Sequence, residues 1–303
     1  MAREARFPIL GVSGGHVEES FGCEMAIHGQ IQSSGLDMHY LDWGGTQRPL
    51  LALHGLSSSA HWYDKCMPRL AAHFRCVAPD QRAHGLTNQP ETGYDWKTLS
   101  EDLIRLLDHL DIERTAVLGH SWGASVAGHF AIQHPERVTA LALIDGGVQR
   151  PRDPNVTWEE FRQRLRQRDI YGAVETYINA HKREHATVWD AELEHMLLSM
   201  PEQLGNDRVR EYLSPSSHEQ VIWNMFSDPL SAIYEEIKVP TLIVSAEGNT
   251  EMSRSYLPMK QQGVADALQR IPDSRSTWIK NAPHDISFYE PQVLATSLID
   301  FLL

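Results

Sequence analysis

The sequence predicts an α/β protein with a mostly parallel central sheet flanked by helices, and with an inserted helical cap. Short apolar runs alternate with amphipathic stretches along most of the chain, and turn residues such as His54-Gly55 bound each run. The alternation stops between about residues 148 and 237. Strands buried on both faces are typically continuous apolar runs, and strand–helix alternation favours parallel pairing through right-handed crossovers.

The candidate strands are six short apolar runs. They are Pro49–Leu53, Arg75–Pro79, Thr115–Leu118, Val138–Ile144, Val239–Val244 and Thr277–Ile279. Helical patterns lie between them, at Leu99–Leu110, Ala124–His134 and about Pro291–Leu303, with apolar residues on one face. The elements needed for a doubly covered sheet are therefore present in the right order.

The interruption divides the chain into three predicted parts. Residues 1–30 form an N-terminal extension, residues 31–147 with 238–303 form the core, and residues 148–237 form the cap. The cap carries charged helical patterns at Trp158–Arg168 and Tyr171–Arg183 and no convincing strand. Sites in open α/β sheets lie at the carboxyl edge of the strands, so a cap there would shape a substrate pocket.

Charge and cysteine usage narrow the possible partners. The formal net charge is -13 at pH 7 and there is no basic tract, which disfavours nucleic acid and anionic membranes. The three cysteines, Cys23, Cys66 and Cys76, do not make a disulfide framework, so we expect a reducing, cytoplasmic location. The N-terminus lacks the apolar core of a signal peptide, and no run would span a bilayer. We expect a small-molecule substrate, and the sequence assigns no oligomeric state.

The sharpest motif is GHSWG at Gly119–Gly123, a G-x-S-x-G pattern. It lies between the apolar run ending at Leu118 and the helical pattern beginning at Ala124, the context of a nucleophile elbow. The turn needs small residues at both two-residue offsets, and the serine then projects at the head of a helix, where backbone N–H groups favour negative charge. Ser121 is therefore the candidate nucleophile.

Three further segments occur in an order that resembles the α/β-hydrolase superfamily over about residues 30–303. His54-Gly55-Leu56 is similar to its oxyanion loop, DQRAHG at Asp80–Gly85 to its D-x-R-x-H-G turn, and Ala282-Pro283-His284 to its histidine loop. The resemblance implies His284 as the base for Ser121. It also implies an oxyanion hole made by the backbone N–H groups of Leu56 and Trp122. We expect His54 and His84 to be structural, orienting loops by hydrogen bonds, and acyl transfer of this kind needs no cofactor.

The triad acid departs from the family pattern. The resemblance places a carboxylate near the ninth residue past Pro240, where this sequence has Asn249. An amide can hold an imidazole in place but cannot stabilise the imidazolium. Asp145 is the first choice for the acid because it ends the strand expected beside the nucleophile strand. Glu247 is the second choice.

The leading interpretation is a serine hydrolase for an ester or lactone. A prolyl-type aminopeptidase or amidase is the alternative, because Asp80-Gln81-Arg82 and Ser121-Trp122-Gly123 are similar to segments of that family. Acidic cap residues that could bind an amine are Glu159, Glu160, Glu175 and Glu184. A non-catalytic binder is a third reading, motivated by Asn249. Epoxide hydrolase and haloalkane dehalogenase chemistry is disfavoured because those relatives use an aspartate nucleophile.

One metal pattern also occurs. His181–His185 reads HKREH, an H-x-x-E-H match that would place two imidazoles on one helical face. It falls in the predicted cap, without an assignable third ligand. We therefore predict no metal in the catalytic site.

Overall fold

The computed structural model describes residues 26–33, 35–45, 47–148, 156–167 and 170–303. Its centre is an eight-stranded sheet with strand order β1-β2-β4-β3-β5-β6-β10-β11. The strands are β1 (Ile27–Ser33), β2 (Leu36–Asp42), β3 (Pro49–Leu53), β4 (Arg75–Pro79), β5 (Thr115–His120), β6 (Val138–Ile144), β10 (Thr241–Ala246) and β11 (Ser274–Ile279). The neighbouring strands β4, β3, β5, β6, β10 and β11 pair in parallel, and β2 pairs antiparallel with both β1 and β4.

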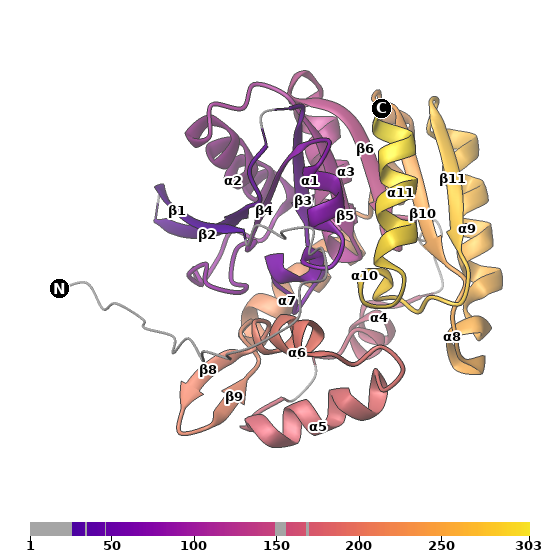
Figure 1. Ribbon diagram of the computed structural model, residues 1–303. Coiled ribbons are helices and arrows are strands. Elements are labelled where there is room, and N and C mark those ends of the chain that lie inside the picture. The colour runs from indigo at the N-terminus through magenta and orange to yellow at the C-terminus, as the bar shows by residue number, and fades with distance from the viewer. Residues whose placement is uncertain (1–25, 34, 46, 149–155, 168–169) are drawn as a thin grey trace, which may run out of the picture.

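Helices cover both faces of this sheet (Figure 1). They are α1 (Met67–Ala71), α2 (Trp96–His109), α3 (Trp122–Gln133), α8 (Glu251–Ser255), α9 (Leu257–Arg270), α10 (Ile286–Tyr289) and α11 (Pro291–Leu302). Successive strand residues face two separate cores: Leu51 and Val117 pack with α2, α3 and α9, while Leu50 and Ala116 pack with α1, α10 and α11. The fold class predicted from the apolar runs is confirmed.

The chain between β6 and β10 forms the cap, below the sheet in Figure 1. Its helices are α4 (Trp158–Arg164), α5 (Val174–Glu184), α6 (Ala191–Leu198), α7 (Pro215–Ser227), η3 (Leu230–Ala232) and η4 (Tyr234–Glu236). It also holds a small antiparallel sheet of β7 (Gly172–Ala173), β8 (Glu202–Gly205) and β9 (Arg208–Arg210).

The expectation that the cap contains no strand was therefore wrong. The β8–β9 hairpin turns at Asn206 and Asp207, which both have positive φ (50° and 54°). Such residues are favoured in two-residue hairpin turns, so the turn was visible in the sequence. The flanking strands are too short and too exposed to show an apolar alternation.

The N-terminal boundary also differs from the prediction. β1 begins at Ile27, inside the predicted extension, and pairs along its whole length with β2, from Ile27 opposite Asp42 to Ser33 opposite Leu36. Residues 1–25 of that extension lie outside the described residues. β1 is an edge strand and half polar, which explains why no apolar run marked it.

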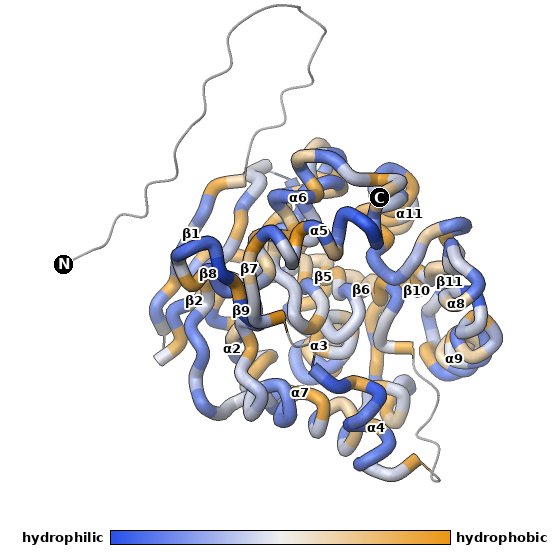
Figure 2. Tube along the Cα trace, turned by 90° about the horizontal axis from the view of Figure 1, so that it is seen from below, coloured by the Kyte–Doolittle hydropathy of each residue, from blue (hydrophilic) through white to orange (hydrophobic). Residues whose placement is uncertain are grey.

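Hydropathy follows this layering. In Figure 2 the hydrophilic colour gathers on outer segments such as α4 and the β8 strand, whereas the central strands carry mostly apolar colour. Among the described residues, no helix is both long and apolar enough to cross a bilayer.

Candidate active site

Ser121 lies in the sharp turn between β5 and α3. Its backbone has φ 55° and ψ −118°, outside the regions that non-glycine residues normally occupy. The Ser121 N–H donates to the carbonyl of Ile144 at 3.0 Å, which fixes the turn against β6. This is the strained strand–turn–helix geometry of a nucleophile elbow.

The two glycines of the motif are required by close backbone approach. A Cβ on Gly119 would lie 2.2 Å from the carbonyl oxygen of Gly123. A Cβ on Gly123 would lie 2.4 Å from the carbonyl oxygen of His54. Both obstacles are backbone atoms, which cannot rotate away. The elbow therefore closes only with glycine at both positions.

The structure brings together the three residues expected to form the triad. His284 Nε2 lies 2.9 Å from Ser121 Oγ, and His284 Nδ1 lies 2.7 Å from Asp145 Oδ2. They come from three places at the carboxyl edge of the sheet: the elbow, the end of β6, and the loop after β11. The Asp145 carboxylate is 2 % exposed, whereas the His284 side chain is 51 % exposed.

Asp145 has a second cationic partner that sequence reasoning missed. Lys260 Nζ, from α9, lies 2.8 Å from each carboxylate oxygen of Asp145 and 3.2 Å from the carbonyl of Ala246. The backbone N–H of Ala246 donates to Asp145 Oδ1 at 3.0 Å. No pattern marked Lys260, because its distance from Asp145 in the sequence is long and α9 was not assigned.

These contacts set the protonation of the pair. Burial opposes ionisation of Asp145, but the hydrogen bond and charge of His284, together with Lys260, lower its pKa to about 2. Partial desolvation opposes protonation of the half-exposed His284 ring, yet the hydrogen bond and charge of Asp145 outweigh it and raise the His284 pKa, while Lys260 acts the other way. Asp145 is therefore a stable counter-charge for an imidazolium.

The two alternative acids are not placed for this role. Asn249 donates its backbone N–H to Ser253 Oγ at 3.1 Å. Glu247 donates its backbone N–H to the carbonyl of Ile279. Among the described residues, no hydrogen bond joins His284 to either side chain.

The predicted oxyanion loop lies directly against Ser121. A Cβ on Gly55 would lie 3.1 Å from Ser121 Cβ, which places the next residue, Leu56, beside the elbow. The following N–H, of Ser57, donates to His84 Nε2 at 3.1 Å. The Leu56 N–H makes no hydrogen bond within the described residues, so it is available, like the Trp122 N–H at the start of α3, to a developing oxyanion.

His54 and His84 brace this loop through both ring nitrogens. His54 Nε2 accepts the Gln81 N–H at 3.0 Å and its Nδ1 donates to the Gly55 carbonyl at 2.8 Å. His84 Nδ1 donates to the carbonyl of Arg82 at 2.9 Å. Burial lowers the pKa of His84 to about 3, so it stays neutral and accepts the Ser57 N–H. These contacts hold the loop in position.

A further support behind the base was not predicted. The Trp62 ring stacks on His120 with centroids 3.8 Å apart, and Trp62 Nε1 donates to Asp285 Oδ1 at 3.0 Å. Burial lowers the pKa of His120 to about 3, so the ring is neutral. Its Nε2–H donates to the His284 carbonyl at 3.1 Å. The motif residue beside Ser121 thus holds the backbone of the base.

The comparisons with known proteins agree with this architecture. A family model described as the alpha/beta hydrolase fold matches residues 48–291. The chain belongs to the α/β-hydrolase family. The chain is 37% identical over 118 residues to a soluble epoxide hydrolase of a Corynebacterium species, covering 39% of this chain and 41% of that protein. It is 32% identical over 139 residues to a haloalkane dehalogenase of Mesorhizobium japonicum, covering 46% and 43%.

These alignments span less than half the length of either relative, so they assign no substrate to this chain. Solved structures agree on the fold over nearly the whole chain. E-2-(acetamidomethylene)succinate hydrolase superposes with a TM-score of 0.73 at 20% identity, covering 91% of this chain and 99% of that one. A thioesterase domain from the curacin biosynthetic pathway gives 0.71 at 19%, covering 90% and 99%.

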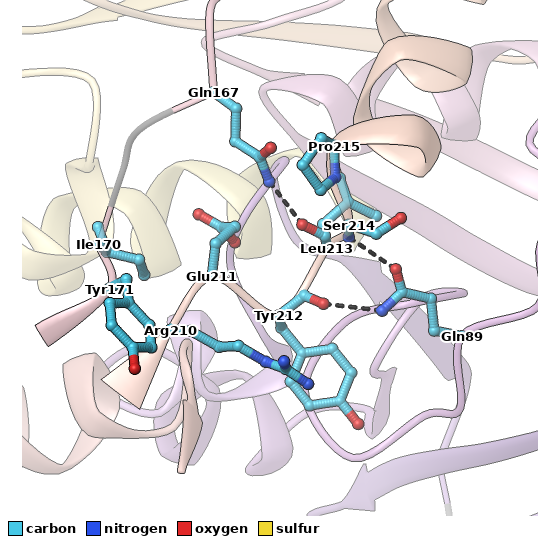
Figure 3. Close-up of a pocket in the computed structure, with 10 residues that line it drawn as sticks. All are labelled: Gln89, Gln167, Ile170, Tyr171, Arg210, Glu211, Tyr212, Leu213, Ser214 and Pro215. Carbon is cyan, nitrogen blue, oxygen red and sulfur yellow. Dashed lines mark hydrogen bonds between the residues drawn. The ribbon is translucent and has the colours of Figure 1, made fainter. Parts of the chain in front are cut away.

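The cap of this α/β hydrolase carries a pocket of about 410 Å³ (Figure 3). Gln89, from the loop after β4, donates to the carbonyl of Tyr212 at 2.9 Å and accepts the Ser214 N–H at 2.6 Å. Ile170 and Tyr171 form the opposite side. None of the lining residues is Ser121, His284 or Asp145, so this pocket belongs to the contact between the cap and the core.

The acidic cap residues do not form an amine site. Glu160 closes a capping box with Thr157 at the start of α4, and Glu159 accepts a hydrogen bond from Gln163. Glu175 and Glu184 are exposed near opposite ends of α5. A peptide N-terminus would need convergent carboxylates, so the amide alternative gains no support from these residues.

Proposed function

We propose that this α/β hydrolase is a serine enzyme that cleaves a small carboxylic ester or lactone through an acyl-enzyme. The observation that carries the proposal is the continuous hydrogen-bonded series at the elbow: Ser121 Oγ to His284 Nε2 at 2.9 Å, and His284 Nδ1 to Asp145 Oδ2 at 2.7 Å. A serine hydroxyl within hydrogen-bond reach of a base, itself oriented by a carboxylate, is the arrangement for nucleophilic catalysis.

In the acylation step, His284 Nε2 takes the Ser121 proton while Oγ attacks the substrate carbonyl carbon. The carbonyl oxygen becomes an oxyanion that accepts hydrogen bonds from the Leu56 and Trp122 N–H groups. Asp145 stabilises the imidazolium without itself taking the proton. The imidazolium then protonates the leaving alkoxide, so the C–O bond breaks and the alcohol departs.

In the deacylation step, water takes the place of the alcohol. His284 removes a proton from water, and the hydroxide attacks the acyl carbon of the ester on Ser121. The tetrahedral intermediate collapses, the proton returns to Ser121 Oγ, and the carboxylic acid is released. Every proton that moves is handled by His284, and the sequence of steps needs no cofactor.

A serine nucleophile also distinguishes the proposed reaction from epoxide hydrolysis and haloalkane dehalogenation, the activities in the relatives' names. Epoxide opening and halide displacement occur at a saturated carbon. A serine nucleophile would there form an alkyl ether, which has no carbonyl for water to attack, so turnover would stop. A carboxylate nucleophile would instead form an ester. Ser121 at the elbow therefore favours acyl transfer.

The test is a substrate panel with active-site labelling. Purified protein is assayed with p-nitrophenyl esters, lactones and aminoacyl anilides, and is treated with a fluorophosphonate probe. We expect ester or lactone turnover and labelling of one serine per chain, both lost in Ser121→Ala, with a fall of about 10⁴-fold or more in kcat. Turnover near the wild-type rate in this variant would remove the proposal.

The same panel separates the alternatives. Preference for the anilides would favour the amidase reading. Stoichiometric labelling without turnover on any substrate would favour a binding protein that keeps its nucleophile. Folding of Ser121→Ala is checked by thermal unfolding, which should be nearly unchanged because, among the described residues, the Ser121 side chain makes a single hydrogen bond, to His284.

A further inference from the structure

Metal-binding side chains gather where the cap meets the core, away from the triad. His61 belongs to η1 (Ala60–Tyr63), Asp64 caps the end of η1, and His195 belongs to α6 of the cap. One ligand atom from each of the three lies within 4.8 Å of the other two. His61 Nδ1 is 2.8 Å from Asp64 Oδ2, and the His61 and His195 rings cross at 83° with centroids 5.1 Å apart.

The charges around this cluster suit a cation. The Asp64 carboxylate has an oxygen within 4.8 Å of a ring nitrogen of both His61 and His195, and the His195 ring makes no hydrogen bond within the described residues, so a negative charge and an available imidazole lie side by side. Glu192, one helical turn before His195 on α6, has its pKa raised by partial burial and by Asp190 and Asp64, against the effect of Lys65. Repulsion among carboxylates is relieved when a cation binds.

A third imidazole lies at the edge of the cluster. The His28 ring, on β1, lies 5.9 Å from the His61 ring between centroids. His28 Nδ1 lies 2.9 Å from His39 Nε2. The core therefore contributes residues from two separate segments, and one cap helix contributes the rest.

The elements that carry the ligands are held together independently of any metal. Lys65 Nζ lies 2.6 Å from Asp190 Oδ2 at the start of α6, and Ser59 Oγ lies 2.7 Å from Ser199 Oγ at its end. Both contacts join the core to α6, on either side of His195. Little ordering would remain when a metal binds, which favours affinity.

We propose that His61, Asp64 and His195 bind one divalent transition metal, with Zn²⁺ as the first candidate, and that the metal joins the cap to the core. Two imidazoles and a carboxylate are ligands that Zn²⁺ commonly takes, leaving a fourth position for water or His28. The site is distinct from the triad, whose hydrogen bonds involve none of these residues. It lies one residue from Trp62, the ring that stacks on His120.

The H-x-x-E-H segment provides the natural comparison. His181, Glu184 and His185 also have ligand atoms within 4.8 Å of one another, but all three lie on or at the end of α5. The His181 and His185 rings are parallel, at 7°, and His185 Nδ1 lies 3.0 Å from Tyr289 Oη. Because the two rings are parallel, their lone pairs point the same way and do not converge on one ion. This group is therefore the weaker candidate, and it provides a matched control for the His61–His195 cluster.

The experiment uses the full chain without a histidine tag, freed of metal by chelator and titrated with ZnCl₂ by calorimetry. We expect one equivalent to bind. His195→Ala should weaken binding at least about tenfold, a loss in the range found when metal-site residues are removed, whereas His181→Ala should leave it unchanged. Zn²⁺ at about 100 times its dissociation constant should raise Tm by roughly 5 °C in the wild type.

Each outcome decides the proposal. The metal-free Tm of His195→Ala should equal that of the wild type, since the exposed ring makes no hydrogen bond within the described residues; Asp64→Asn is the second variant if it does not. Binding that survives in both variants, or that is lost in His181→Ala, would overturn the assignment. So would the absence of any Zn²⁺ binding to the wild type.

Discussion

Lys260 donates to both carboxylate oxygens of Asp145, at 2.8 Å each. The carboxylate of Asp145, the proposed triad acid, therefore interacts with two groups, His284 and Lys260. Because Lys260 opposes protonation of His284, it lowers the pH at which the base becomes available.

The first prediction follows from that charge. His284 accepts a proton only when neutral, so kcat/KM rises as the pH rises through its pKa. Lys260→Met removes a positive charge, raises the His284 pKa further, and should move the acidic limb of the kcat/KM profile to higher pH. On the alkaline plateau we expect a loss of less than about tenfold.

The control is Lys97→Met, at a side chain that is 81% exposed and remote from the triad. Its profile should match the wild type. An acidic limb that stays in place, or moves to lower pH, in Lys260→Met would show that the lysine does not act on the base.

The second prediction concerns the identity of the acid. Asp145→Asn removes the carboxylate that accepts the His284 Nδ1–H, and should lower kcat by about 10³- to 10⁴-fold. Asn249→Ala and Glu247→Gln should each cost less than about tenfold, because neither side chain reaches His284. Steady-state kinetics on the best ester would measure this, and a larger loss in Glu247→Gln than in Asp145→Asn would contradict it.

The third prediction concerns the stability of the D-x-R-x-H-G turn. Asp80 is fully buried and accepts the Ala60 N–H on Oδ1 at 2.7 Å, and the Leu86 N–H and His39 Nδ1 on Oδ2 at 2.8 and 2.7 Å. Asp80→Asn places an NH₂ group against a donor whichever way the amide turns. We expect a loss of about 2 to 4 kcal/mol in the free energy of unfolding.

Urea denaturation measures that loss. The matched control is Asp108→Asn, the same change at a carboxylate that is 62% exposed and pairs with Arg137. Its midpoint should stay close to that of the wild type, because surface ion pairs contribute little. Equal destabilisation of the two variants would mean that the buried hydrogen bonds of Asp80 are not what stabilises the turn.

The fourth prediction concerns the cap, taken as about residues 148–237. If it governs substrate choice, His218→Ala should change the ratio of rates between short-chain esters and lactones by severalfold or more, because His218 is a buried residue of α7 close enough to His84 to help lower the pKa of that ring. Fluorophosphonate labelling of Ser121 should proceed at nearly the wild-type rate. An unchanged substrate profile would count against a role of the cap in substrate choice.

Much of the fold was predictable because buried parallel strands leave a strong signal. Pro49–Leu53, Arg75–Pro79 and Val138–Ile144 have the same bounds in the sequence analysis and in the structure. The edge strand β1 and the β8–β9 hairpin left little apolar signal, because one or both faces meet solvent. α9 was missed because its apolar residues are sparse.

The candidate site was predictable where a motif fixes the backbone. The elbow and the histidine loop have local sequence patterns, so Ser121 and His284 could be named. Asp145 needed the further argument that β6 lies beside β5, which the pairing of the two strands supports. Lys260, Trp62 and the His61–His195 cluster come together only through tertiary packing, and no local pattern records such contacts.

The position of Asp145 also determines where the cap could be exchanged. The chain leaves the sheet through Gly146 and Gly147, and a Cβ on Gly146 would lie 2.1 Å from the Ser121 carbonyl oxygen. Tyr234, on the returning segment, donates its hydroxyl to the Gly147 carbonyl at 2.8 Å. The two ends of the insertion are thus joined beside the triad. A foreign cap would have to be inserted between Gly147 and Tyr234, with both residues retained, for Asp145 to keep its position.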